Sequence, residues 1–278
     1  MTTYDALRQA TTALGRAGVH HAGREAVWLL EHVTGMGHAA LVAVRDRTLT
    51  RGEAARLKRL VAARSRRYPL QYLLGSVPFA GVHLVVSPAV LIPRPETEEL
   101  AELAQSLVAG RPGRLRCADL GTGSGCIAIA LAHAMPASRW HASDISADAL
   151  EVACANAKAN GVARRMAFRQ GFWFTALPAA ARYDLVVANP PYVAKGTPLE
   201  PELAHEPQEA LYAGCDGLEA YREILAGLRG RLKPDGWFAG EIGLGQGRTL
   251  RALARAEGFT TVSCRRDLTG RERFLVLR

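Results

Sequence analysis

Asn189, Pro190, Pro191 and Tyr192 form a short, rigid turn directly after an apolar segment, Tyr183–Ala188. Such a segment is typical of a buried parallel strand, and open α/β sheets bind ligands at the carboxyl ends of their strands. The Asn189 side-chain oxygen and the Pro190 carbonyl can each accept an N–H bond from a planar nitrogen group, on which Tyr192 can stack. Pro190 and Pro191 fix φ and stiffen the turn. The run therefore predicts a site that holds an amide or an exocyclic amine; the alternative is a plain strand followed by a Pro-rich turn.

A glycine-rich run lies upstream, between a short apolar strand pattern at 115–118 and a buried helix pattern at 126–132. The candidate cofactor-binding residues of this run are Asp119, Gly121, Thr122, Gly123, Ser124 and Gly125. Glycines let a ligand approach the backbone closely, and the helix start offers unpaired N–H groups. A nicotinamide fingerprint would need a glycine where Cys126 stands. The alternating glycines instead resemble motif I of S-adenosylmethionine-dependent methyltransferases, and an acid at Asp119 suits a sulfonium and an ammonium better than a pyrophosphate.

Asp144 follows the next apolar segment, Trp140–Ser143. An acid about 20 residues beyond a glycine loop is placed to bind ribose hydroxyls in nucleotide-binding sheets. Asp144 could instead cap the helix that begins near Ala147, a role that Ser146 could fill equally well. The three elements stand in the right order, each at a strand end, and together they favour a methyltransferase site.

The composition bounds the class of protein. The chain has 278 residues, 49% of them hydrophobic, which is enough for a large core and a smaller second domain. No apolar run is long enough to span a bilayer, and the first residues lack a signal-peptide pattern. The 5 cysteines show no paired spacing, which favours a reducing cytoplasm over disulfides or a zinc site. The net charge of +9 suggests either an anionic partner or a basic solvated surface.

Three regions are expected along the chain. Residues 1–74 show helical periodicity, with a capping-box pair at Thr50 and Glu53, and should form a helical domain. Residues 75–94 suggest a β-hairpin linker. Residues 95–278 alternate strands with helices, which predicts an α/β domain with a parallel, doubly wound sheet whose last two strands pair antiparallel.

The elements of the larger domain follow from its apolar periodicity. Strands are expected near 115–119, 139–143, 165–169, 183–188, 235–241, 259–264 and 273–278, and helices near 96–109, 124–134, 147–160, 217–231 and 245–257. The stretch from Val193 to Asp216 looks irregular, and loops of that length tend to be functional.

Further motifs extend over nearly the whole chain. They are Arg67–Gly75, Leu91–Glu98 (Leu-Ile-Pro-Arg-Pro-Glu-Thr-Glu), His205–Pro207 through Leu211, Asp216–Leu218, Glu241–Gly243 and Asp267–Arg271. With the glycine loop and Asn189–Tyr192, these segments resemble the bacterial release-factor glutamine methyltransferase family. Asn-Pro-Pro-Tyr alone is shared with amine-directed DNA and RNA methyltransferases, whereas the Leu91–Glu98 segment is much more specific.

The resemblance implies both fold and activity. It implies a Rossmann-like class I methyltransferase sheet with a C-terminal antiparallel hairpin, preceded by a small all-helical N-terminal domain, residues 1–74, that recognises the substrate. It also implies S-adenosylmethionine as the cofactor and methylation of the side-chain amide of the glutamine in the Gly-Gly-Gln loop of peptide chain release factors. The partner is then a protein, and we expect a cytoplasmic monomer without membrane attachment or sequence-specific nucleic-acid binding.

Site residues carry over from the family by position. Gly121–Gly125 line the cofactor together with Asn189, Asp144 binds its ribose, and Trp173 packs beside the adenosine. Asn189, Pro190, Pro191 and Tyr192 hold the glutamine. This chain departs from the family at Phe172, where an acid is common, so the adenine contact and the alignment of Trp173 stay open; a core aromatic is the alternative for Trp173.

Several charged residues have two possible roles. Arg94, Glu96 and Glu98 could line the mouth of the pocket, or could cap and charge-balance the first helix of the domain. His205 and Glu206 carry the same ambiguity.

Three other functions are compatible with the same motifs. A related enzyme could methylate a glutamine of a ribosomal protein, and a nucleic-acid amine methyltransferase could use Asn189–Tyr192 on a flipped base. A non-catalytic adaptor could bind the cofactor for stability alone, although the intact Asn189 and Tyr192 argue against it. For catalysis we expect a direct in-line displacement without a general base, because a methylated amide nitrogen that carries an extra proton is strongly acidic.

Overall fold

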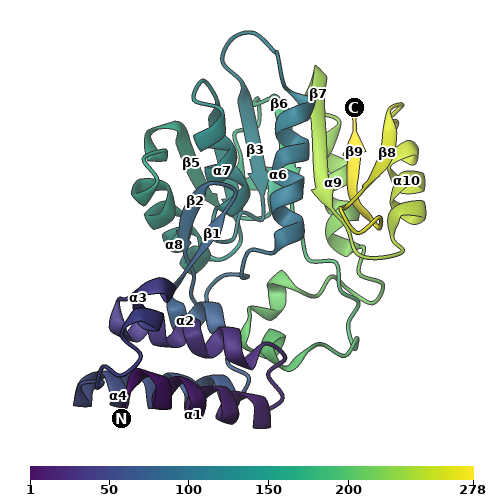
Figure 1. Ribbon diagram of the computed structural model, residues 1–278. Helices are drawn as coiled ribbons and strands as arrows, with labels where there is room; N and C mark the ends of the chain where they lie inside the picture. The colour runs from purple at the N-terminus through teal and green to yellow at the C-terminus, as the bar shows by residue number, and fades with distance from the viewer. The chain divides into compact units, whose positions relative to one another are not determined.

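The computed structural model describes all residues, 1–278. The chain forms two compact units, Met1–Gly75 together with Leu199–His205, and Ser76–Pro198 together with Glu206–Arg278. Each unit has a hydrophobic core of its own and is described by itself (Figure 1). None of the helices combines the length and apolar character that crossing a membrane requires.

The smaller unit consists of amphipathic helices. They are α1 (Thr3–Arg16), α2 (Ala22–Thr34), α3 (His38–Ala43), α4 (Arg51–Ser65), α5 (Leu70–Leu74) and the short 3₁₀ helix η3 (Pro201–His205). Each long helix buries one face, and Leu14, Leu29 and Leu30 lie at the centre of the shared core. Thr2 and Thr50 begin α1 and α4 with complete capping boxes, so the pair expected at Thr50 is present.

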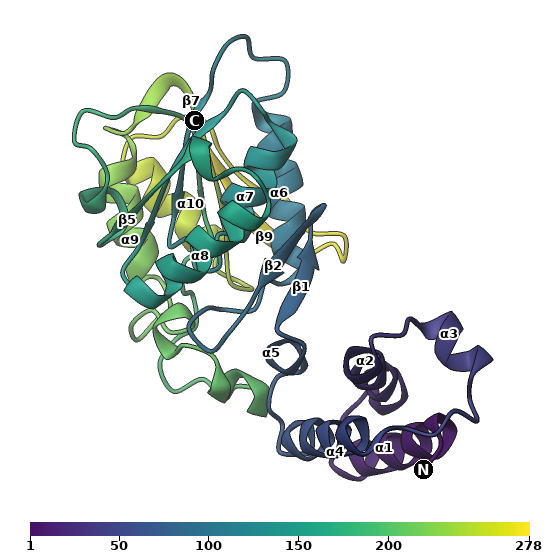
Figure 2. The same ribbon diagram turned by 90° about the vertical axis from the view of Figure 1, so that its left-hand side faces the viewer.

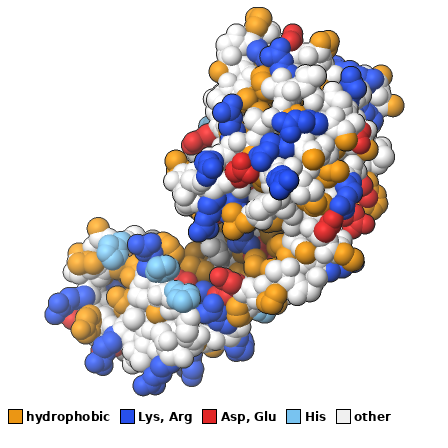
Figure 3. Space-filling model, turned by 90° about the vertical axis from the view of Figure 1, so that its right-hand side faces the viewer, with side chains coloured by type: hydrophobic (Ala, Val, Ile, Leu, Met, Phe, Trp, Pro, Cys, Tyr) orange, Lys and Arg blue, Asp and Glu red, His pale blue; other side chains and the backbone are white.

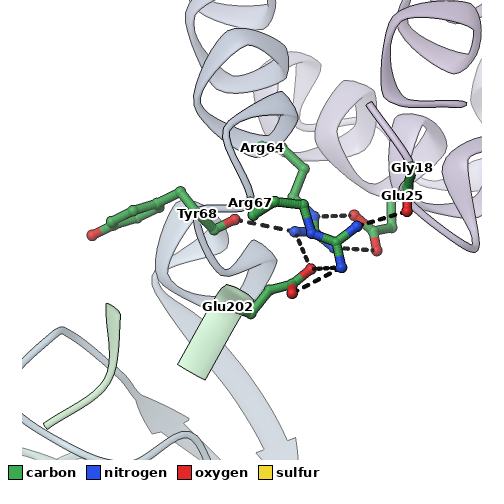
Figure 4. Close-up of polar contacts among 6 residues, drawn as sticks. All are labelled: Gly18, Glu25, Arg64, Arg67, Tyr68 and Glu202. Atoms are coloured by element: carbon green, nitrogen blue, oxygen red, sulfur yellow. Dashed lines mark hydrogen bonds and ion pairs between the residues drawn. The ribbon is translucent and has the colours of Figure 1, made fainter. Parts of the chain in front are cut away.

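A buried ion-pair cluster holds the segment Leu199–His205 against these helices (Figure 4). Glu202 accepts hydrogen bonds from Arg64 Nη1 at 2.8 Å and from Arg67 Nη2 at 2.9 Å. Arg64 also donates to both carboxylate oxygens of Glu25. The Arg64 side chain is only 7% exposed. Because two carboxylates surround one buried guanidinium, loss of either carboxylate would leave part of that buried charge uncompensated.

The larger unit is built on a seven-stranded mixed sheet. Its strands are β3 (Arg116–Leu120), β4 (Arg139–Asp144), β5 (Met166–Gln170), β6 (Tyr183–Ala188), β7 (Leu232–Glu241), β8 (Val262–Arg266) and β9 (Glu272–Leu277). Their order is β5-β4-β3-β6-β7-β9-β8, and only the pairs that involve β9 are antiparallel. This architecture confirms the predicted class I methyltransferase sheet with its C-terminal antiparallel hairpin.

Helices cover both faces of this sheet (Figures 1 and 2). One face carries α6 (Pro95–Leu107), α7 (Cys126–Ala134) and α8 (Ala147–Ala159), and the other carries α9 (Glu219–Leu228) and α10 (Gly247–Ala256). Short 3₁₀ helices stand in the connections, namely η1 (Ala163–Arg165), η2 (Trp173–Ala176) and η4 (Gln208–Ala210). Ala118, Leu120 and Val186 of the central strands pack in one core with Ile224 of α9. Burial on both faces explains the continuous apolar runs that predicted these strands.

Two strands begin away from the predicted positions. β7 extends back to Leu232, which pairs with Tyr183 across an irregularity in the ladder. β8 begins at Val262, because Phe259 belongs to the turn that ends α10 instead. Gly258 adopts a positive φ of 84°, and the Phe259 N–H donates back to a carbonyl of α10 at 3.1 Å. The apolar side chain of Phe259 thus closes a helix end and is not part of a strand.

A two-stranded hairpin, β1 (Ser76–Phe79) and β2 (Val82–Val85), forms the start of the larger unit. Its turn residues Ala80 and Gly81 both have positive φ, at 41° and 83°. That geometry is typical of two-residue hairpin turns, whose twist matches the strands. The hairpin predicted within 75–94 is therefore present, and β2 packs beside α8.

Asn156 of α8 and Asn160, the C-cap of that helix, bind the edge of β2. Asn156 exchanges two hydrogen bonds with the Val85 backbone, at 2.7 and 3.0 Å. Asn160, one helical turn later, exchanges the same pair with the His83 backbone. Asn156 also donates to the Ser124 carbonyl at 2.9 Å. The pair closes a strand edge that would otherwise be unpaired, and Asn156 joins that edge to the glycine loop.

Basic side chains are dispersed on the surface that Figure 3 shows. Lys and Arg recur across this face, with acidic and apolar side chains between them. On this face the basic charge is therefore interspersed, as on an ordinary solvated surface.

Asn156→Ala should lower the free energy of unfolding by about 2–3 kcal/mol, because three hydrogen bonds are lost at a site with no exposure. Asn160→Ala is the matched control, since it also removes three hydrogen bonds, two with the His83 backbone and one to the Asn156 carbonyl, at a position that is only partly buried. We expect it to cost about 0.5–1 kcal/mol. Urea unfolding of both variants measures the difference. Equal losses would show that burial of Asn156 does not set its contribution.

Candidate functional site

Parallel pairing brings the predicted site residues to one edge of the sheet. β3 lies between β4 and β6, and Leu120 pairs with both Ser143 and Ala188. The glycine loop, Asp144 and Asn189 follow these positions directly, so they converge at the carboxyl edge. They border a cavity of about 380 Å³. The predicted residues that line it are Gly121, Thr122, Gly123, Ser124, Asp144, Trp173, Asn189 and Pro191, whereas Asp119, Gly125, Pro190 and Tyr192 are not among its lining residues.

The glycine loop has its shape because its glycines take conformations that side chains would prevent. Gly121 and Gly125 have φ of 71° and 82°. A Cβ on Gly125 would lie 2.6 Å from Ile129 Cδ1. A Cβ on Gly121 would approach the ring of Trp173 to 3.0 Å. These positions therefore admit only glycine without local rearrangement, and they leave the cavity open beside the loop.

Asp144 braces the glycine loop. One carboxylate oxygen accepts from the Gly123 N–H at 2.8 Å, and the other accepts from the Ser146 N–H at 3.0 Å. Ser146 is the residue that caps α8, because its hydroxyl accepts from the Ala149 N–H. Burial raises the pKa of Asp144, and its backbone hydrogen bonds oppose that rise. Since the capping role falls to Ser146, Asp144 is left at the cavity wall.

Asp119 is a buried carboxylate with an unused hydrogen-bonding oxygen. It is 1% exposed. One oxygen accepts from the Thr122 hydroxyl at 2.6 Å, and Oδ1 has no partner. The buried hydroxyl of Ser124 also lacks a partner. Burial raises the pKa of Asp119 to about 7, against the lowering effect of its hydrogen bond with Thr122. A buried carboxylate with one oxygen free fits a cationic ligand group, such as the ammonium of S-adenosylmethionine.

The three aromatic residues Phe172–Phe174 differ in position: one lies in the core and two line the cavity. Phe174 is buried in the core of the larger unit. Trp173 lines the cavity, with φ of 40°, and its indole N–H donates to Glu223 at 2.7 Å. Phe172 also lines the cavity and is 57% exposed. Sequence reasoning did not single out Ile145, which lines the same cavity and is 47% exposed. The sequence signal for Ile145 was an apolar residue directly after a strand-end acid.

Asn189 belongs to a hydrogen-bond chain that ends at a buried acid. Its Nδ2 donates to Thr97 Oγ1 at 3.2 Å, and the Thr97 hydroxyl donates to Glu241 Oε2 at 2.7 Å. Tyr192 donates to Glu241 Oε1 at 3.1 Å. Burial raises the pKa of Glu241, which is 1% exposed, and also that of the Tyr192 hydroxyl. Sequence reasoning did not propose Thr97 or Glu241 as site residues, although Glu241 ends the strand next to the one that precedes Asn189.

The charged residues with two possible roles in the sequence lie in different surroundings in the structure. Glu206 is 4% exposed; it accepts from the Ile92 N–H at 2.9 Å and pairs with Arg94. Arg94 lines the cavity, whereas Glu96 and Glu98 lie in the first turn of α6 and are not among the lining residues. His205, in the smaller unit, packs edge-on against the ring of Tyr68 with centroids 5.1 Å apart.

Asp119→Asn should stabilise the ligand-free protein at alkaline pH. The folded-state pKa of about 7 lies above the ordinary value of 3.8, so the neutral carboxyl is favoured by folding. That contribution is complete below about pH 4 and is lost as the pH rises through about 7. The variant should therefore match the wild type near pH 4 and unfold at a higher temperature near pH 8.

Thermal unfolding of the ligand-free proteins across this pH range measures the effect. Asp148→Asn, an exposed acid of α8, is the control and should not reproduce a difference that grows with pH. A constant difference between Asp119→Asn and the wild type at every pH would contradict the assignment.

Comparison with known proteins agrees with this geometry. The model of the PrmC N-terminal domain matches residues 5–75, and that of the methyltransferase small domain matches residues 101–212. The crystal structure of the hMettl16 catalytic domain in complex with the MAT2A 3'UTR hairpin 1 superposes with a TM-score of 0.57 at 17% identity, over 90% of this chain and 88% of that one. At this identity the match supports the fold alone.

Curated relatives match over much longer stretches of sequence. The release factor glutamine methyltransferase of Cereibacter sphaeroides is 41% identical over 281 residues, which cover 100% of this chain and 99% of the relative. The protein of the same name from Bordetella pertussis is 43% identical over 251 residues, which cover 90% and 92% of the two chains. The chain therefore belongs to the release factor glutamine methyltransferase family and is a methyltransferase that uses S-adenosylmethionine.

Proposed function

We propose that the protein methylates the side-chain amide nitrogen of the glutamine in the Gly-Gly-Gln motif of peptide chain release factors. The name that its relatives share supports a release factor as the substrate. The observation that carries the proposal is the hydrogen bonding of the Asn189 side chain. Its NH2 group is engaged with Thr97, so its oxygen is the free polar atom of a side chain that lines the cavity. A substrate NH2 group needs an acceptor of this kind.

The cofactor would occupy the side of the cavity formed by the glycine loop. When bound, S-adenosylmethionine supplies a methyl group carried on a positively charged sulfur. Asp119 would bind a cationic group of the cofactor, and Asp144 its ribose hydroxyls. Trp173 and Ile145 line the cavity near Asp144 and would pack against the nucleoside. Gly121–Gly125 would lie along its backbone-facing side, where the absence of Cβ atoms permits close approach.

The motif residues would act by holding and polarising the substrate amide. An amide nitrogen is a poor nucleophile because its lone pair is delocalised, so attack depends on geometry. Holding two reactants in attack geometry can supply on the order of 7–11 kcal/mol. Asn189 Oδ1 and the Pro190 carbonyl would accept the two N–H bonds and stabilise positive charge that develops on nitrogen. The ring of Tyr192 would stack on the amide plane, and Pro191 would keep the turn stiff. The acidic proton of the product nitrogen then leaves to solvent.

The regions of the chain would divide the work. Residues 1–74 would recognise the protein substrate, residues 75–94 would connect the two parts, and residues 95–278 would carry catalysis.

A labelling experiment tests the proposed substrate. The enzyme is incubated with radiolabelled S-adenosylmethionine and, separately, a purified release factor, total ribosomes or duplex DNA. We expect label on the release factor alone, and mass spectrometry should place the methyl group on the glutamine of Gly-Gly-Gln. A release factor whose glutamine is replaced by glutamate is the control and should stay unlabelled. Label on ribosomes or DNA only would overturn the proposal.

Asn189→Ala should lower kcat on a release factor by about 100-fold, because one preorganised acceptor at the reacting nitrogen is lost. The affinity for S-adenosylmethionine should change by less than about 3-fold, since only one of many contacts is affected. Steady-state kinetics and calorimetric titration measure the two quantities. Asn160→Ala, at the partly buried C-cap of α8 and away from the cavity, is the matched control. Near-normal turnover of Asn189→Ala would show that Asn189 does not hold the substrate.

A further inference from the structure

Glu241 is a buried acid without an ion-pair partner. It ends β7, beside the strand that leads into Asn189, and it is 1% exposed. Its two carboxylate oxygens are satisfied by hydroxyls, Thr97 Oγ1 at 2.7 Å and the Tyr192 hydroxyl at 3.1 Å. A buried carboxylate costs stability even when it is hydrogen-bonded, and an apolar side chain of similar size would fill the same space. The position of Glu241 thus calls for an explanation other than packing.

The carboxylate fixes the direction of the hydrogen bonds. Both oxygens of the Glu241 carboxylate accept from hydroxyls, so the single Thr97 proton points to Glu241. The Thr97 oxygen is then an acceptor, and the group that faces it at 3.2 Å must be the NH2 side of Asn189. A carboxamide rotated by half a turn would place its oxygen against an oxygen that has no proton to give. The chain of two hydrogen bonds therefore decides which atom Asn189 presents on its other side.

We propose that Glu241 is a positioning residue that acts through Thr97 to fix the Asn189 oxygen as the acceptor for the substrate amide. This inference rests on the proposed function, in which Asn189 receives the substrate NH2 group. The second oxygen of Glu241 holds the hydroxyl of Tyr192 and so restrains the ring next to the same nitrogen. One buried carboxylate thereby orients both the acceptor and the stacking ring of the motif.

Glu241→Met should separate catalysis from stability. Methionine removes the carboxylate and keeps similar volume, so the Thr97 proton is free to turn to Asn189 and the carboxamide can rotate. Loss of this positioning should lower kcat between about 10-fold and 100-fold. The KM for the release factor and the affinity for S-adenosylmethionine should each change by less than about 3-fold. The unfolding temperature should stay close to that of the wild type, because replacement of a buried charge by an apolar group is often neutral.

Variants of Thr97 test the relay itself. Thr97→Val keeps the shape and removes the hydroxyl, and it should lower kcat clearly but by less than Glu241→Met, because the hydrogen bond from Tyr192 to Glu241 is kept. Thr97→Ser restores the hydroxyl and should restore most of the turnover. Tyr221→Phe is the structural control: the Tyr221 hydroxyl donates to the backbone carbonyl of Glu241 and not to its carboxylate. It should lower stability and leave kcat unchanged.

A double-mutant cycle closes the test. If Thr97 acts through Asn189, adding Thr97→Val to Asn189→Ala should lower kcat by less than about 3-fold further. Independent, multiplicative losses would overturn the inference, and so would normal turnover of either Glu241→Met or Thr97→Val. Normal turnover of Asn189→Ala alone would instead show that the proposed function of Asn189 is wrong. The two failures are therefore distinguishable.

Discussion

The parallel pairing of β3 with β6 places Leu120 opposite Ala188, and the residues that follow these positions are the glycine loop and Asn189. A strand register shifted by one residue would turn every side chain to the opposite face. The buried residues on both faces of these strands prevent that shift. The site is therefore assembled by the sheet, and the distance between its cofactor side and its substrate side depends on the same register that organises the core.

Two buried carboxylates at this edge differ in how they are satisfied. Asp119 keeps an oxygen without a partner, and Glu241 has a hydroxyl on each oxygen. Burial raises the pKa of both groups. Asp119 has an oxygen free to bind a cationic ligand. Both oxygens of Glu241 already accept hydrogen bonds, so this acid is suited to orienting the side chains that donate them. Acids whose pKa is raised by burial are a recurrent feature of functional sites.

Much of this organisation could be predicted from local sequence, because strands buried on both faces give continuous apolar runs and turns use glycine and proline. The capping role of Ser146 could not be separated from that of Asp144, since either side chain can cap a helix. The apolar Phe259 predicted a strand and instead closes α10. Thr97 and Glu241 lie within the motifs noted in the sequence, but their joint role could not be predicted because they stand 144 positions apart. Only the folded sheet and α6 bring them together, and no single segment records that contact.

The orientation of one carboxamide is the central claim of this account. A crystal structure with S-adenosylhomocysteine and a Gly-Gly-Gln peptide measures it directly. We predict that Asn189 Oδ1 lies within hydrogen-bond distance of the glutamine amide nitrogen, while Nδ2 stays on Thr97 and the nucleoside lies against the glycine loop. A glutamine nitrogen bound away from Asn189, or a carboxamide turned to present its NH2 group to the substrate, would contradict the account.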